Sequence, residues 1–377
     1  MYFLINLIHP YMYELLRDLA TIDDPRRQAG KRHDLCIVLF LCILSILQGA
    51  KGYRSIGRFI SDNAAFLMSY LPLKKPRLPS LSTVIRVLQV VDYDQLSLVI
   101  STWQTKCLPV QELYVVCGDG KGIGGTCENL LGTNQNYVRV CSFFEAFSGV
   151  VVSVVPYDNK ADAETKVFQA MVNKLALPGE VLITGDALHC QRKTVEICAS
   201  KGFSYLFKVK QNQPHLYNSI TVAHQSDDLL DFFHTSERQK GRIEHRKIHL
   251  YAFSDKLTHK WKNAKVCMVV TRSGKRKGKL YQRESYYISD RVDSAEVFLA
   301  FIRMHWLIEN RLHWNKDVNY MEDKSKIRKK NAPKTLTVIR GFALGELHKN
   351  GNTQIKARMQ QLTNNPQKMV DLLNYRE

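Results

Sequence analysis

The spacing of apolar residues divides the chain into a helical first part and a mixed second part. Residues 1–105 carry segments of helical periodicity, including an almost uninterrupted apolar run from Leu35 to Leu47. This run is too short to span a bilayer, so it predicts a buried helix. Pro72, Pro76 and Pro79 mark a loop between two predicted helices. The first part is therefore a small helical module with basic loops, either a DNA-binding head or a packing domain.

From residue 112 onward, short apolar runs bounded by glycine alternate with helical segments. These runs predict buried strands and one hairpin, at 113–118, 138–155, 180–184 and 203–209. Their order, with helices after the hairpin and between the later strands, predicts an α/β fold with a mixed sheet and flanking helices. Stretches of alternating polarity then predict a β-rich insertion over 211–290.

A late helical pattern begins near Asp293 and carries a distinctive group of polar residues. Its apolar stripe consists of Val297, Phe301, Met304, Ile308 and Leu312. At about 100° per residue, the polar residues on the flank of this stripe are His305, Glu309, His313 and Lys316. Such a face fits either a partly solvated helix with ion pairs, or a carboxylate that binds a metal beside groups that contact an anion.

Charge and cysteine usage narrow the class of protein. The chain has 377 residues, 54 Lys and Arg against 35 Asp and Glu, and a formal net charge of +19. This excess favours a polyanionic partner, either nucleic acid or an anionic membrane surface. Basic runs at 272–283 and 324–330 agree with this, although the first could be a solvated loop tip. The 9 cysteines form no Cys-x-x-Cys pair, which favours reduced thiols in a cytoplasmic protein over disulfides or a zinc site.

Three acidic residues stand where a metal site could form. Asp119 and Asp186 each follow a predicted buried strand, and ligand sites of open α/β sheets lie at such strand ends. Glu309 is the acid of the late helix. Mg²⁺ prefers carboxylate oxygens, and two ions roughly 4 Å apart can support phosphoryl transfer. A single Asp at a strand end often only caps the following turn, so the three acids together carry this prediction.

The residues around these acids resemble the three catalytic blocks of DDE insertion-sequence transposases of the H-repeat-associated type. The blocks are Val116–Lys121, Thr184–Gln191 and His305–Trp314. Further blocks agree in order along the chain, at 23–26 with 31–33, 206–213, 241–244, 286–289 and 322–333. The resemblance covers about residues 15 to 348, nearly the whole chain.

The resemblance implies an RNase H-like core with a β-rich insertion before the Glu309 helix. The implied domains are a helical N-terminal DNA-binding domain at 1–108, the catalytic domain at 109–210 and 291–348, the insertion at 211–290 and a tail at 349–377. It implies catalysis by Asp119, Asp186 and Glu309, which would hold two Mg²⁺ ions, with Mn²⁺ as an alternative. It also implies cleavage at the terminal repeats of an element and transfer of the 3′-OH to target double-stranded DNA. The expected enzyme is a cytoplasmic, nucleoid-associated homodimer or larger assembly without a membrane partner.

The expected DNA contacts combine residues near the three acids with residues of the basic run at 324–330, which is too dense for a buried face. They are Lys121, His305, Asn310, Lys316, Lys324, Lys326, Arg328 and Lys329. Lys316 resembles the Lys of a Glu-x6-Lys spacing in related transposases, whereas His305 replaces the usual upstream Arg. A Gly-rich stretch at 122–126 also replaces a basic one, which predicts weaker contacts there. Two alternatives stay open: a nuclease without strand transfer, and a catalytically inactive DNA-binding derivative.

Overall fold

The computed structural model describes residues 10–128, 135–226, 228–239, 242–276 and 279–374. The chain forms two compact units. Unit 1 comprises Met1–Pro109, Gly120–Glu164 and Glu309–Glu377, and unit 2 comprises Val110–Asp119 and Thr165–Ile308. The first strand of the sheet passes from unit 2 into unit 1 at Gly120. These units differ from the domains expected from the sequence. The domain boundaries given above stay a prediction.

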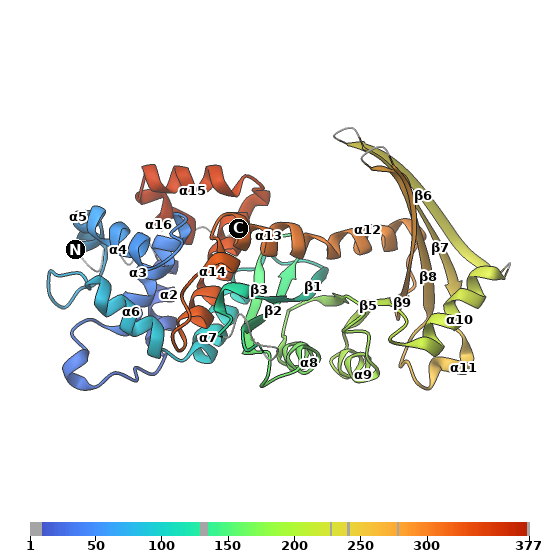
Figure 1. Cartoon of the computed structure of the whole chain (residues 1–377), viewed down its shortest axis with the longest axis horizontal. Helices are drawn as coiled ribbons and strands as arrows, with labels where there is room; N and C mark the ends of the chain where they lie inside the picture. The colour runs from blue at the N-terminus through green and yellow to red at the C-terminus, as the bar shows by residue number, and fades with distance from the viewer. Residues whose placement is uncertain (1–9, 129–134, 227, 240–241, 277–278, 375–377) are drawn as a thin grey trace. The chain divides into compact units, whose positions relative to one another are not determined.

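The helical part of unit 1 is built around the long apolar run of the sequence (Figure 1). Its helices are α2 (Pro10–Ala20), η1 (Gln28–Gly30), α3 (Leu35–Leu47), α4 (Tyr53–Asp62), α5 (Ala64–Tyr70), α6 (Leu81–Val90) and α7 (Tyr93–Lys106). Helix α3 is apolar on every side and contacts α2, α4, α6 and α14 (Ala332–His348), so its burial was predicted correctly. Among the described residues, no helix has both the length and the apolarity needed to cross a membrane.

The remaining part of unit 1 packs helices against a β-hairpin. Strands β2 (Val138–Glu145) and β3 (Val151–Asp158) pair antiparallel, as the sequence predicted. Helices α7 and α14 contact β3, and the Ser97 hydroxyl donates a hydrogen bond of 2.6 Å to the Val154 carbonyl. The other elements of unit 1 are η2 (Gly124–Thr126), α13 (Trp314–Val318), η4 (Glu322–Lys324), η5 (Lys349–Gly351), α15 (Ile355–Asn364) and α16 (Gln367–Asn374).

Unit 2 contains parallel strands followed by the insertion. Its first strands are β1 (Leu113–Gly122), β4 (Glu180–Gly185) and β5 (Ser204–Val209), which pair in parallel in the order β1-β4-β5. The crossover helices are α8 (Glu164–Lys174) and α9 (Arg192–Ser200). In unit 1, the Ile123 amide at the end of β1 donates to the Val138 carbonyl at the start of β2. An antiparallel hairpin, a shared strand β1 and two parallel strands are the RNase H-like arrangement, so the predicted fold class is confirmed.

The insertion is an antiparallel meander of four long strands (Figure 1). The strands are β6 (Leu229–Gln239), β7 (Arg242–Ala252), β8 (Val266–Arg276) and β9 (Lys279–Ser289), and β9 pairs with β5. Helices α10 (Pro214–Gln225) and α11 (Asp255–Thr258) belong to the same region. The sequence predicted neither α10 nor β6. Strand β6 was missed because it is an edge strand with exposed apolar residues, Leu230 and Phe232, and so lacks the alternation of a half-buried strand.

The late helix is interrupted where the sequence predicted continuity. Helix α12 (Ala295–His305) ends at Trp306, and a π-helical turn, η3 (Ile308–His313), precedes α13. A π-helical turn holds more residues than an α-helical one, which rotates the residues after it. Lys316 is fully buried as a result. The expectation that Lys316 lies with Glu309 on the flank of the apolar stripe is therefore wrong, and His313 is buried as well.

Candidate active site

The parallel pairing of three neighbouring strands of unit 2 stops at the same level of the sheet. Gly118 of β1 pairs with Gly185 of β4, and Gly185 pairs with Phe207 of β5. The next residues of these strands are Asp119, Asp186 and Lys208. Adjacent strands lie about 4.8 Å apart, so side chains of one row can reach a shared ligand. Asp186 directly follows β4, whereas Asp119 lies within β1, so the prediction that Asp119 follows its strand is wrong. The pairing still sets the two acids next to each other on adjacent strands, with a lysine beside them.

Asp186 both caps a turn and presents a carboxylate to solvent. Its Oδ1 accepts a hydrogen bond of 2.9 Å from the Leu188 amide, and 43% of its side chain is exposed. The buried His189 places Nε2 at 4.0 Å from Asp186 Oδ1 and stacks its ring on Phe168 at 3.9 Å between centroids. The capping role and a ligand role are therefore compatible, because one oxygen orients the group while the carboxylate stays accessible.

His305 lies beside the same strand ends. Its Nδ1 is 3.0 Å from Oγ1 of Thr184, which precedes Gly185 on β4. Burial lowers the pKa of His305, while the carboxylates of Asp119 and Asp186 act in the opposite direction. The imidazole is therefore a mainly neutral group near both acids. Its hydrogen bond ties the end of α12 to β4.

Lys208 is a candidate site residue that the sequence analysis did not select. Burial lowers the pKa of its ammonium, Lys210 adds to this effect and Asp186 opposes it. Its Nζ lies 5.9 Å from the ring centroid of Trp306, and no carboxylate of the described residues forms an ion pair with it. The available signal was the block 206–213, which the sequence analysis noted as part of the resemblance without selecting a site residue from it.

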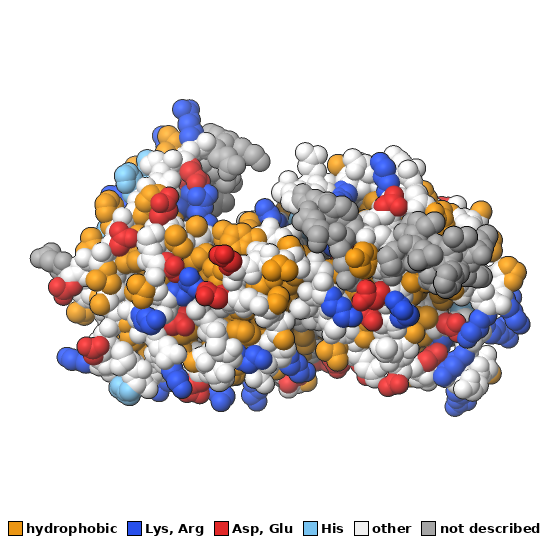
Figure 2. All heavy atoms as spheres, turned by 180° about the vertical axis from the view of Figure 1, so that it is seen from behind, with side chains coloured by type: hydrophobic (Ala, Val, Ile, Leu, Met, Phe, Trp, Pro, Cys, Tyr) orange, Lys and Arg blue, Asp and Glu red, His pale blue; other side chains and the backbone are white. Residues whose placement is uncertain are grey.

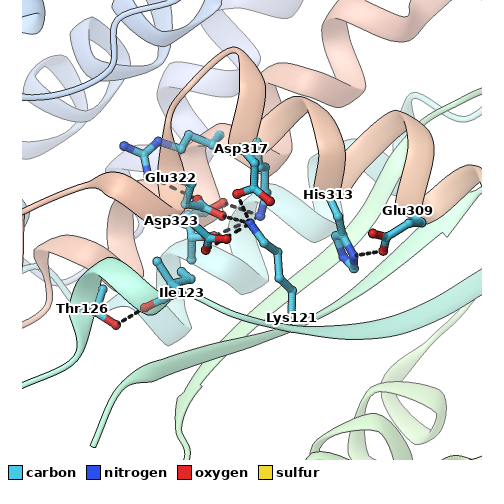
Figure 3. Close-up of polar contacts among 11 residues, drawn as sticks. Lys121, Ile123, Thr126, Glu309, His313, Asp317, Glu322 and Asp323 are labelled. Carbon is cyan, nitrogen blue, oxygen red and sulfur yellow. Dashed lines mark hydrogen bonds and ion pairs between the residues drawn. The ribbon is translucent and has the colours of Figure 1, made fainter. Parts of the chain in front are cut away.

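Glu309 opens the part of unit 1 that follows α12. It directly follows Ile308, the last residue of unit 2, and stands four residues after His305 in the chain. The side chain of Glu309 is 57% exposed, and its Oε2 lies 3.3 Å from Nδ1 of His313 (Figure 3). Asn310, the next residue, is exposed. Glu309 is thus an accessible carboxylate with an imidazole partner.

Lys121 is held by carboxylates within unit 1 (Figure 3). Its ammonium pairs with Asp317, lies 3.5 Å from Asp323 and 3.7 Å from Glu322, and only 11% of the side chain is exposed. Burial acts to lower the pKa of Lys121, but Glu322 and Asp317 outweigh it, so the pKa is raised. Lys121 therefore neutralises internal acids in this structure and does not present a free cation to DNA.

Lys316 is also an internal residue. Its Nζ donates to the Thr337 hydroxyl at 2.9 Å and to the Thr337 carbonyl at 3.2 Å. Burial lowers the pKa of Lys316 to about 8. The carboxylate of the buried Glu322 interacts electrostatically with both lysines. It also accepts a hydrogen bond of 3.2 Å from the Arg340 guanidinium. We call Lys121, Lys316, Glu322 and Arg340 the buried charge cluster.

The remaining expected DNA contacts lie on one exposed loop of unit 1. The exposed residues are Lys324 at the end of η4, and Lys326, Arg328 and Lys329 in the loop between η4 and α14. Arg328 Nε donates to the Gly125 carbonyl at 2.7 Å. A Cβ at Gly125 would lie 2.4 Å from the Ser325 carbonyl oxygen. Gly125 is therefore the residue at which the Gly-rich stretch lies against the backbone of the basic loop, where a side chain would not fit.

Glu164 is a further acid near the candidate site. A Cβ at Gly120, the residue after Asp119, would lie 2.2 Å from the Glu164 carboxyl carbon. Glu164 is buried, pairs with Arg139 and accepts from the Tyr157 hydroxyl at 3.2 Å. The sequence carried no specific signal for it, because an acid in the first turn of a helix is common.

Gly120→Ala is expected to destabilise the chain by about 1–3 kcal/mol, because the added methyl group overlaps the Glu164 carboxylate and forces it from Arg139. Chemical denaturation monitored by circular dichroism measures this. Gly124→Ala is the matched control, since a Cβ at Gly124 meets no atom within 4 Å. Equal unfolding midpoints for the two variants would mean that the Glu164 side chain moves away from the added methyl group at no cost in stability.

Two family models match this chain. The model described as DDE_Tnp_1-associated matches residues 16–104, and the model described as Transposase DDE domain matches residues 119–344. The chain belongs to the DDE transposase family. The resemblance seen in the sequence is thereby confirmed. Members of this family are DNA-binding enzymes that depend on a divalent metal. As a member, the chain shares these general properties.

The transposase chain is also similar to curated bacterial proteins over most of its length. It is 30% identical to "Putative transposase YncI" of Escherichia coli O157:H7, over 88% of this chain and 87% of that protein. It is 29% identical to "H repeat-associated putative transposase YhhI" of Escherichia coli strain K12, over 89% of this chain and 90% of that protein. Both similarities span the helical region and the DDE domain together.

Proposed function

We propose that this transposase cleaves double-stranded DNA at the ends of its insertion sequence and transfers the freed 3′-OH to target DNA. Asp119, Asp186 and Glu309 are the proposed catalytic residues and ligands of two Mg²⁺ ions, with Mn²⁺ as an alternative. The observation that supports the proposal is the pairing of Gly118 with Gly185, since the residues that follow them on β1 and after β4 are Asp119 and Asp186. A homodimer or larger assembly is proposed because two element ends must be joined.

The donor chemistry of these residues fits hard divalent ions. Carboxylate oxygens are the ligands that Mg²⁺ prefers, and the Asp186 and Glu309 side chains are accessible. When bound, the ions would supply Lewis-acid stabilisation of the phosphate and a lowered pKa of the attacking water. The Leu188 amide orients the Asp186 carboxylate, and His313 orients that of Glu309.

Lys208, His305 and the exposed basic loop are proposed to hold the DNA. Lys208 stands in the row of the two aspartates and has a cation to offer to a phosphate oxygen. His305 precedes Glu309 by four residues and Asn310 directly follows it, and both are proposed to contact the DNA near Glu309. Lys324, Lys326, Arg328 and Lys329 supply backbone contacts that give affinity without sequence information. We do not assign DNA contacts to Lys121 and Lys316, because both ammonium groups are engaged inside unit 1.

A strand-transfer assay tests the proposed reaction. The substrate is a labelled duplex that carries the inverted repeats flanking the coding region, mixed with plasmid target and Mg²⁺. Joined products are expected with the wild-type chain. Nicked products without joining would favour a stand-alone nuclease, and DNA binding without cleavage would favour an inactive derivative.

Lys208→Ala is expected to lower the cleavage rate by about 10- to 100-fold, because a partly buried cation near developing phosphate charge is lost. Single-turnover cleavage at saturating Mg²⁺ measures this. Lys208→Arg should retain most activity, and Lys174→Ala at an exposed position of α8 should behave as wild type. An unchanged rate for Lys208→Ala would remove Lys208 from the site.

A further inference from the structure

Two basic loops of the helical region line a hollow that the candidate active site does not use. One loop precedes α3 and the other joins α5 to α6. The polar residues that line the hollow are Arg32, His33, Asp34, Lys74, Lys75 and Arg77. We call this group the loop pocket. Five of its six members are Arg, Lys or His, and they come from segments some 40 residues apart in the chain.

The first loop is held in one shape by Arg26, which the pocket itself does not include. The Arg26 guanidinium donates to Asp24 at 2.8 and 2.7 Å and to the His33 carbonyl at 2.8 Å. Only 9% of the Arg26 side chain is exposed. The loop thus has an internal bidentate ion pair that fixes the backbone at His33, so the pocket is preorganised.

The charges of the loop pocket do not balance. Lys74 Nζ lies 2.7 Å from Asp34 Oδ1, which neutralises the one acid. Arg32, Lys75 and Arg77 form no ion pair with a carboxylate among the described residues. Burial lowers the pKa of His33, and the positive charges of Arg77 and Arg26 lower it further. His33 is therefore neutral at pH 7, beside a surplus of positive charge.

Helix α3 adds to this field. Its first residue, Leu35, follows Asp34, and Ile37 of its first turn reaches the hollow. The Asp34 side chain makes no capping hydrogen bond to the α3 amides. The partial positive charge of a helix N-terminus favours anions, here together with three unpaired basic side chains. Figure 2 shows Lys and Arg side chains gathered at its lower right edge, over this helical end of unit 1.

We propose that the loop pocket binds backbone phosphates of duplex DNA. This inference rests on the proposed function, because that function supplies DNA as the polyanion. The chemistry of the pocket is that of a phosphate site: guanidinium groups, an ammonium group and a neutral imidazole able to donate. Contacts of this kind position DNA and are independent of its sequence. The pocket accordingly anchors the helical region on the duplex without reading the terminal repeat.

The test is the salt dependence of DNA binding by the full chain. Fluorescence anisotropy with a short labelled duplex of arbitrary sequence is recorded from about 50 to about 300 mM KCl. For Arg32→Ala with Arg77→Ala, the slope of log K against log salt should fall by about two, since each lost phosphate contact removes about 0.9. Affinity near physiological salt should fall on the order of tenfold. The matched control is Lys166→Ala with Lys174→Ala, which removes the same charge from exposed positions of α8.

The outcomes separate this inference from the proposed function. A wild-type slope in the pocket variant, or equal loss in pocket and control variants, would overturn the loop pocket while leaving the transposase reaction intact. Failure of the wild-type chain to bind duplex would instead overturn the proposed function. Arg32→Lys with Arg77→Lys keeps both charges and should keep the slope, which separates charge loss from misfolding. A further outcome concerns anionic phospholipid vesicles, added to compete with DNA for the chain. If the pocket variant binds DNA as wild type does but no longer binds the vesicles, the loop pocket binds a membrane surface, and the proposal is overturned.

Discussion

Replacing Asp186 with Asn is expected to reduce metal-dependent DNA cleavage and joining by roughly a thousandfold or more. Loss of one ligand carboxylate removes charge from the proposed metal site, and roughly 4 kcal/mol of transition-state stabilisation corresponds to this factor. The variant isolates charge from folding, because the Asn carbonyl can still accept the 2.9 Å hydrogen bond from the Leu188 amide. Single-turnover cleavage and Mg²⁺ titration by calorimetry measure the two effects.

Asp162→Asn is the control for this prediction. Asp162 is exposed and lies outside the strand-end row, so the variant should cleave as wild type does. Glu309→Gln should reproduce the loss seen with Asp186→Asn if both carboxylates serve one centre. Cleavage by Asp186→Asn within tenfold of wild type, with its fold intact, would end the assignment of this residue as a metal ligand.

Replacing Glu322 with Gln is expected to lower the stability of unit 1 by about 3–5 kcal/mol, because it leaves buried cations uncompensated. Glu322 is fully buried, with Arg340 at 3.2 Å and Lys121 at 3.7 Å from its oxygens. Burial acts to raise its pKa, but Lys316, Arg340 and Lys121 prevail and lower the pKa to about 2. Thermal unfolding at neutral pH measures the loss, and the exposed Asp323→Asn is the control.

The same cluster predicts an acid limit to stability. Because the pKa of Glu322 is lower in the folded chain than its ordinary value of 4.5, its contribution is complete above that value. It is lost as pH falls through the folded value of about 2. The melting temperature of the wild-type chain should therefore fall between these limits more steeply than that of Glu322→Gln. Parallel pH profiles of the two proteins would contradict the role of the buried charge cluster.

Local patterns in the sequence were sufficient wherever one segment decides its own structure. The apolar run of α3, the hairpin of β2 and β3 and the end of β4 directly before Asp186 were predicted at their observed places. Strand β1 was predicted to end before Asp119, but it continues to Gly122. Each of these depends on neighbours along the chain: apolar runs, turn residues and the point at which polarity returns. The β6 edge strand was missed because its exposed apolar residues carry no such pattern.

Positions that depend on distant partners were not predictable in this way. From the sequence, Lys121 and Lys316 could not be told from lysines that contact DNA. In the structure, both ammonium groups have partners within unit 1. Lys121 meets Asp317, a residue 196 positions away, and only folding brings the two together. Lys208 belongs to the block 206–213, but its candidacy as a site residue follows from the pairing of Gly185 with Phe207.

The sequence by itself determined the family, the α/β class and the two aspartates that follow the apolar runs of β1 and β4, since these follow from residue types and local spacing. The tertiary structure decided the order and register of those strands, and with them the row formed by Asp119, Asp186 and Lys208. It also decided which lysines are internal and which are exposed. The physical reason is that Coulomb interactions and burial act between neighbours in space, whatever their separation along the chain.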